Sequence, residues 1–105
     1  MESVLIAKSS IATNNASKYL KWLCGHFKIK TEAQYDDQHG HIMFEFGTCD
    51  MQANPDSLFI HVQANDEESF TLIKDVVGGH LERFAHKEAI KVIWQDQTKV
   101  ISNEA

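Results

Sequence analysis

The chain has 105 residues, of which 43% are hydrophobic and 24% are charged, and this composition predicts one globular domain over residues 1–105. Its formal net charge of -5 argues against a general nucleic-acid binder, because such proteins bind mainly by neutralising phosphates. The first ten residues lack the basic start of a signal peptide, and no stretch is apolar enough to span a membrane. We therefore expect a cytoplasmic protein without a membrane partner.

The first elements are a strand and a helix. Val4, Ile6 and Ile11 predict the strand. The helix that follows ends near Lys28, because apolar residues recur at spacings of four, three and four: Ala16, Leu20, Leu23 and Phe27. Its flank carries three rings, Tyr19, Trp22 and His26, which suit either a domain edge or the lip of a pocket.

The same helix and the residues after it form the most basic part of the chain. No acidic residue stands between Ser17 and Thr31, a stretch that contains Lys18, Lys21, Lys28 and Lys30. These lysines form either a solvated helix face or a docking place for a small anionic partner. Cys24, on this helix, and Cys49 form no CxxC motif, so we expect two core thiols rather than a disulfide.

From Thr31 onward the apolar period changes to two, which predicts consecutive antiparallel strands. We expect strands over 32–35, 41–46, 49–53 and 58–64, with a turn over 36–40. His39 and His41 then fall at the turn, where they are either exposed or a weak chelating pair. The outer face of the sheet is apolar enough to suggest a homodimer, through Met43, Glu45, Phe59, His61 and Ile93.

The stretch from Asp66 to Lys87 predicts a second helix whose apolar side contains a histidine. Asn65 or Asp66 is the expected N-cap, and Gly78 and Gly79 indicate a bend or the close approach of another backbone. His80 projects near the middle of the apolar stripe, with Arg83 at its edge. Because an unsatisfied buried polar group costs about 1–3 kcal/mol, this imidazole needs a partner.

Ile90, Val92 and Trp94 alternate and predict a last strand, followed by a frayed tail over 98–105. The expected order is strand, helix, four strands, helix, strand. This order predicts an α+β fold, a two-layer sandwich in which two helices cover one face of a largely antiparallel sheet.

Three segments resemble the bacterial family known as domain of unknown function 2218: ASKYLKWLCGHF (16–27), GHIMFEFGTCDM (40–51) and VVGGHLERFAHKEAIKVIW (76–94). The resemblance implies a small stand-alone domain, met in iron and siderophore gene surroundings, with no established activity. Its characteristic positions correspond to Tyr19, Leu23, His26, His80, Leu81, Arg83, Phe84 and Trp94. The chain departs from the family pattern at Ile29, where many relatives carry a second histidine, so no role that needs that histidine holds here.

Three hypotheses about function follow. The first is a non-catalytic ligand-binding or accessory module with its site where the helices meet, around His26, His80, Arg83, Tyr19 and Trp22. The second is a zinc, iron or haem protein that uses His26 and His80, with Glu82, Glu88 or Cys24 completing the shell. The third is a small enzyme in which His80 is a general base and Arg83 holds an anionic substrate.

Overall fold

The computed structural model describes the backbone of residues 2–101 and the side chains of residues 4–97. The elements are β1 (Glu2–Ala12), α1 (Ala16–Lys28), β2 (Glu32–Tyr35), β3 (His39–Phe44), β4 (Gly47–Ala53), β5 (Ser57–Ala64), α2 (Glu67–Phe84), the 3-10 turn η1 (His86–Glu88) and β6 (Gln95–Ile101). The predicted α+β class and element order are confirmed. Neither α1 nor α2 is long and apolar enough to cross a membrane.

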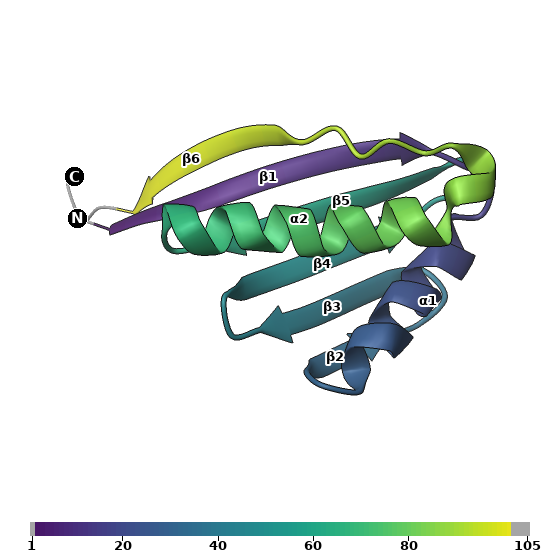
Figure 1. Ribbon diagram of the computed structural model, residues 1–105, viewed down its shortest axis with the longest axis horizontal. Helices are drawn as coiled ribbons and strands as arrows, with labels where there is room; N and C mark the ends of the chain where they lie inside the picture. The colour runs from purple at the N-terminus through teal and green to yellow at the C-terminus, as the bar shows by residue number, and fades with distance from the viewer. Residues whose placement is uncertain (1, 102–105) are drawn as a thin grey trace.

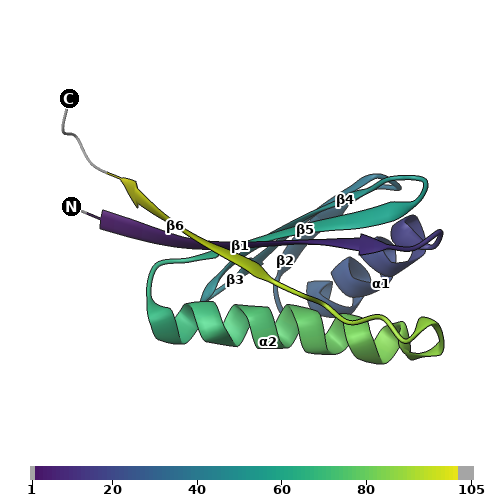
Figure 2. The same cartoon turned by 90° about the horizontal axis from the view of Figure 1, so that it is seen from above.

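The six strands form one antiparallel sheet in the order β2-β3-β4-β5-β1-β6. Both helices lie on the same face of this sheet, α2 along the β1, β5 and β4 side and α1 toward the β2 edge (Figure 1). Seen from above, the helices form one layer and the sheet the other (Figure 2). The opposite face of the sheet carries no helix, so side chains there face away from the core.

Strict alternation along the strands places the core between the two layers. In β5, four alternate residues are buried, Leu58, Ile60, Val62 and Ala64, whereas the residues between them are half-buried. On α1 the residues at helical spacing complete the core, with Leu20, Leu23 and Cys24 fully buried.

Gly40 lets α1 sit close to the sheet. A Cβ at this position would lie 2.7 Å from the sulfur of Cys24 and 3.1 Å from Cδ2 of Leu20. Gly40 is buried in β3, whereas His39 and His41 on either side point to the helix-free face. The prediction that His39 lies in the turn over 36–40 is therefore wrong, because the turn ends at Gln38, whereas His41 lies in a strand, as the predicted range 41–46 implied.

The start of α2 follows the sequence, whereas the helix ends at Phe84 rather than near Lys87. Asp66 is the N-cap, and its carboxylate accepts a hydrogen bond of 2.7 Å from the backbone N–H of Ser69. A Cβ at Gly78 would lie 3.3 Å from the indole nitrogen of Trp94, so this glycine makes room for a side chain rather than for another backbone. A Cβ at Gly79 would meet nothing within 4 Å.

The last strand begins later than predicted. Residues 90–94 are irregular and pack partly buried side chains, Ile90, Val92 and Trp94, against the core, whereas β6 pairs with β1 from Gln95 to Ile101. Of the predicted frayed tail, residues 98–101 belong to β6 and residues 102–105 lie outside the described part of the chain. Ile93 is 74% exposed and does not belong to the sheet, which removes it from the predicted dimer face. The dimer itself stays a prediction.

We predict that Gly40→Ala lowers the free energy of unfolding by about 1–3 kcal/mol, because its methyl group would overpack the contact between α1 and β3. Gly79→Ala is the matched control, and it should raise stability by about 0.5–1 kcal/mol, because alanine favours the helix and the added methyl group meets open space. Urea denaturation measures both changes. A Gly40→Ala variant as stable as the wild type would contradict this account of the α1 packing.

Candidate functional site

The two histidines singled out from the sequence lie next to each other. His26 on α1 and His80 on α2 have ring centroids 5.0 Å apart, with their planes tilted by 44°. His26 is exposed and His80 is half-buried. The fold therefore joins residues that are 54 positions apart in the sequence at the contact between the helices.

His80 is satisfied by its own helix. Its Nδ1 lies 2.7 Å from the carbonyl oxygen of Val76, one turn earlier. Because a carbonyl oxygen only accepts, Nδ1 carries the proton in this contact. Nε2 is then the nitrogen that His80 can offer to a ligand. The partner expected for this imidazole thus comes from the α2 backbone rather than from a second element.

A continuous series of ring contacts runs from solvent into the gap between the helices. Trp22 stacks on Phe84 with centroids 4.7 Å apart, and Phe84 meets the edge of His26 at 5.6 Å. Phe27 then touches both histidines and continues the series to Phe44 on the sheet. Each pair of this kind adds about 0.5–1.5 kcal/mol beyond the area it buries. These contacts fix how α1 and α2 meet.

Trp22 lines a shallow hollow on α1. Its side chain is 47% exposed although it is held flat against Phe84. The ammonium of Lys18 lies 5.9 Å from the indole centroid. The hollow has a volume of about 580 Å³ and is lined by Ser17, Lys18, Lys21 and Trp22. An exposed ring and two lysines thus share one surface, although Lys21 also pairs with Asp37 at 3.0 Å.

The other proposed site residues have different surroundings. Arg83 is exposed, and among the described side chains it forms no ion pair with Glu82 or Glu88. Glu82 accepts a hydrogen bond of 2.8 Å from the backbone N–H of Val92. Tyr19 is 5% exposed and its hydroxyl donates to Glu88, so it connects elements rather than facing the hollow.

Glu88 ties the turn after α2 to the start of α1. Its carboxylate accepts hydrogen bonds from the Thr13 hydroxyl and the Asn15 amide, both at 2.9 Å, and from the Tyr19 hydroxyl. These donors, with Tyr19 the strongest, lower the pKa of Glu88 below its usual value. Burial, followed by the neighbouring Glu88, raises the pKa of Tyr19. This network makes Glu88 a structural acceptor.

Glu82 and Glu88, two of the expected third metal ligands, therefore already have hydrogen-bond partners. Cys24 and Cys49 are free thiols, as predicted, and both are fully buried. Burial raises the pKa of Cys24 to about 11, so it is a protonated thiol at neutral pH. Across the described side chains, no group of three or more histidine, cysteine, aspartate or glutamate residues is arranged to hold a metal ion.

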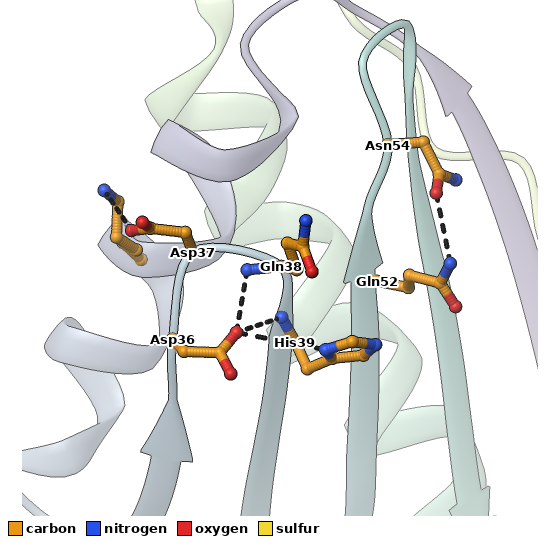
Figure 3. A network of polar contacts seen from close by, with 7 residues as sticks. Asp36, Asp37, Gln38, His39, Gln52 and Asn54 are labelled. Atoms are coloured by element: carbon orange, nitrogen blue, oxygen red, sulfur yellow. Dashed lines mark hydrogen bonds and ion pairs between the residues drawn. The ribbon is translucent and has the colours of Figure 1, made fainter.

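Sequence reasoning missed a groove on the helix-free face of the sheet. It is lined by several polar residues, among them His39, His41, Asp50 and His61. At its mouth the Asp36 carboxylate accepts hydrogen bonds of 2.8 and 2.7 Å from the backbone N–H groups of Gln38 and His39 (Figure 3). The H-G-H alternation was the available signal, since alternate strand residues share a face.

The sequence matches, over residues 8–95, the family described as an uncharacterized protein conserved in bacteria, DUF2218. A solved structure, the NMR structure of PA4090 from Pseudomonas aeruginosa, is 30% identical in sequence with a TM-score of 0.72. That match covers 90% of this chain and 96% of the other. Among curated proteins, none matches the chain.

We predict that Glu88→Gln destabilises the protein at pH 7 and that the difference from wild type shrinks in acid. Because the folded pKa of Glu88 lies below its usual value of 4.5, its ionised form contributes stability above that pH. This contribution disappears as the pH falls through the lowered pKa, where the wild-type carboxyl becomes neutral. Urea denaturation at pH 7 and near pH 3 measures the change.

Glu45→Gln is the control for Glu88→Gln, because Glu45 is an exposed glutamate in the turn between β3 and β4. It should show a much smaller difference at pH 7. A Glu88→Gln difference that stays constant over this pH range would show that the charge of Glu88 does not hold the two elements together.

Proposed function

This chain belongs to the bacterial family DUF2218, and we propose that it is a small non-catalytic module that binds a planar anionic ligand beside Trp22. The observation that carries the proposal is the placement of Trp22, nearly half exposed yet stacked on Phe84 beside Lys18. Rigid exposed aromatic side chains are frequent binding anchors, because little conformational freedom is lost when a ligand packs on them.

The charges around Trp22 favour an anion. Lys18 and Lys21 line the same hollow, and Arg83 lies exposed one helical turn after His80, on the helix that carries Phe84. A flat ring can stack on the indole while its carboxylate meets the lysine ammonium groups. His26 contacts both Phe84 and His80, with ring centroids 5.6 and 5.0 Å away. Of the site residues proposed from the sequence, only Trp22 lines this hollow, so the proposed site is centred on Trp22 and Lys18 and no longer includes Tyr19.

We also propose a cellular location and a metabolic connection for this protein. A cytoplasmic location is supported by the two free thiols in the core, because disulfides are rare in reducing compartments. We propose an iron or siderophore connection only from the gene surroundings that the resemblance implies, and aromatic carboxylates such as 2,3-dihydroxybenzoate are the matching ligand class. Their planar rings and single negative charge fit a hollow lined by Trp22 and lysines.

A second candidate function is metal or haem binding by His26 and His80. It is favoured by the 5.0 Å separation of the rings and by the hydrogen bond from Nδ1 of His80 to a carbonyl, an arrangement typical of metal-binding histidines. A metal ion held by only two imidazoles would take its remaining ligands from water. The third hypothesis, with His80 as general base and Arg83 as anion clamp, would use Nε2 of the same ring.

We predict that benzoate and 2,3-dihydroxybenzoate quench the fluorescence of Trp22 in a Trp94→Phe background, where Trp22 is the one remaining tryptophan. Lys18→Gln should raise the dissociation constant about tenfold, equivalent to about 1.4 kcal/mol, because the carboxylate loses its ammonium partner. Benzamide, which has the same ring without the charge, should bind about tenfold more weakly than benzoate.

Lys91→Gln is the control for Lys18→Gln, since Lys91 is an exposed lysine outside the hollow and the charge change is equal. It should leave the dissociation constant within about twofold. Equal effects of the two lysine substitutions, or equal binding of benzoate and benzamide, would contradict the proposal. An advantage of 2,3-dihydroxybenzoate over benzoate would support the iron connection, and equal affinities would remove its support.

For the second candidate, we predict that Ni²⁺ raises the melting temperature of protein prepared without a histidine tag. His26→Gln and His80→Gln should each abolish the increase, because either change leaves a single imidazole. His86→Gln is the control, since its ring contacts the Arg83 carbonyl instead. Haem uptake is followed by absorption spectroscopy on the same variants. A response that survives both His26→Gln and His80→Gln would exclude this pair.

A further inference from the structure

The helix-free face of the sheet carries a row of polar side chains across adjacent strands. The strand register pairs His41 with Asp50 and Asp50 with His61. Directly paired residues project from the same face of a sheet, so these three side chains stand side by side. The row continues in both directions, to Gln34 on β2 and to Lys8 on β1.

Four members of this row, Gln34, His41, Asp50 and His61, line a groove of about 540 Å³, a volume in the usual range for small-molecule sites. The lining combines polar groups with aromatic surface. Its members are Gln34, Tyr35, Asp36, His39, Gly40, His41, Asp50, Met51, Gln52, Phe59 and His61. The groove lies on the opposite side of the sheet from the Trp22 hollow, and the two share no residue.

Apart from its histidines, the charged side chains that line the groove are all negative. Asp36 and Asp50 are its carboxylates, and no lysine or arginine is among the lining residues. Backbone N–H groups of Gln38 and His39 donate to the Asp36 carboxylate and lower its pKa below the usual value. Lys8 stands opposite His61 on β1 but does not line the groove. A cation is therefore favoured over an anion here, the reverse of the hollow beside Trp22.

The imidazoles define which groups a ligand would meet. Nδ1 of His41 lies 2.5 Å from Oδ1 of Asp50, which orients both side chains and leaves the second carboxylate oxygen as an acceptor. Nε2 of His61 is buried and has no hydrogen-bond partner among the described residues. In the tautomer with its proton on Nδ1, that nitrogen is also an acceptor. Asp50 and His61, on neighbouring strands, thus line one groove, and the buried Nε2 of His61 is without a partner among the described residues.

We propose that this groove binds a small organic cation, an amine, amidine or guanidine, whose N–H groups donate to Asp50 and His61. The carbon frame of the ligand packs on the half-buried ring of Phe59, which lines the same groove. A metal ion fits less well, because the described donors do not form a group of three around one point. An extended ligand with several N–H groups meets acceptors that are spread along a strand row.

The proposal is tested by amide ¹⁵N–¹H NMR titration with three ligands of one shape: benzamidine, benzamide and benzoate. Benzamidine should shift the amide signals of Gln34, His41, Asp50 and His61 in a saturable way. Benzamide lacks the charge and should bind about tenfold more weakly. Benzoate should leave these signals unchanged and shift those around Trp22, so the failure of one site is distinguishable from the failure of the other.

Asp50→Asn should raise the benzamidine dissociation constant about tenfold. Asp75→Asn is the control, because Asp75 is an exposed aspartate on α2 and the change in net charge is the same. It should change the constant by no more than about twofold. His61→Phe is a second test, for use if Asp50→Asn does not fold. It keeps a ring of similar size but removes the acceptor, so it should weaken benzamidine binding several-fold.

Four results would overturn the proposal. The first is equal binding of benzamidine and benzamide at the groove, and the second is an equal effect of Asp50→Asn and Asp75→Asn. The third is a dimer, seen by sedimentation, whose formation broadens the amide NMR signals of the groove residues without any ligand. A second copy of this chain would then occupy the groove. Tight Zn²⁺ binding by His41 and His61, with benzamidine inert, would reassign the groove to a metal and also overturn it.

Discussion

Aromatic rings join α1 to α2, and the arrangement of the candidate site depends on that contact. Phe27 touches both His26 and His80, and Phe84 lies between Trp22 and His26. These rings are large and stiff, so the contact fixes an orientation as well as burying area. If the helices met differently, Trp22 would lose its stacking partner and the two imidazoles would separate. The hollow on α1 and the histidine pair are thus consequences of one interface.

Two further constraints hold that interface in place. Gly40 allows α1 to lie close on β3, where any larger residue would meet Cys24 and Leu20. Glu88 fastens the turn after α2 to Thr13, Asn15 and Tyr19 at the start of α1. One constraint sets the depth of the helix on the sheet, and the other joins the end of one helix to the beginning of the other. Together they explain how a small domain keeps an exposed tryptophan in a fixed position.

The two faces of the molecule have opposite chemistry. On the helical face, Lys18 and Lys21 surround an exposed indole, whereas on the sheet face Asp36 and Asp50 line a groove without a lysine or arginine. The net charge of -5 does not reveal this difference, because it sums the charges of both faces. Under the two proposals, this module would hold an anion on one face and a cation on the other.

Periodicity predicted the helices and most strands, because burial of one face imposes a spacing of 3.6 or of two residues. It failed at residues 90–94, where Ile90, Val92 and Trp94 alternate because they pack along the core and not because they form a strand. Periodicity also could not predict the hydrogen-bond partner of His80. Any helix offers a carbonyl four residues earlier, so a buried-looking histidine does not require a tertiary partner.

The row His41, Asp50 and His61 was unpredictable for a different reason. Its members come from three strands, and only the register places them side by side. Register depends on turn lengths, and the turn before β3 was assigned two residues too long, up to Gly40. The proximity of His26 and His80 likewise depends on how two helices cross, which residue spacing along each helix does not determine.

The most direct test of the central claim is a solution measurement of the α1–α2 contact itself. Nuclear Overhauser effects between the ring protons of His26 and His80, and between those of Trp22 and Phe84, report these distances without any ligand. The structure predicts both sets, since the ring centroids are 5.0 and 4.7 Å apart. Their absence in a well-dispersed spectrum, with Trp22 rotating freely in solvent, would contradict the account.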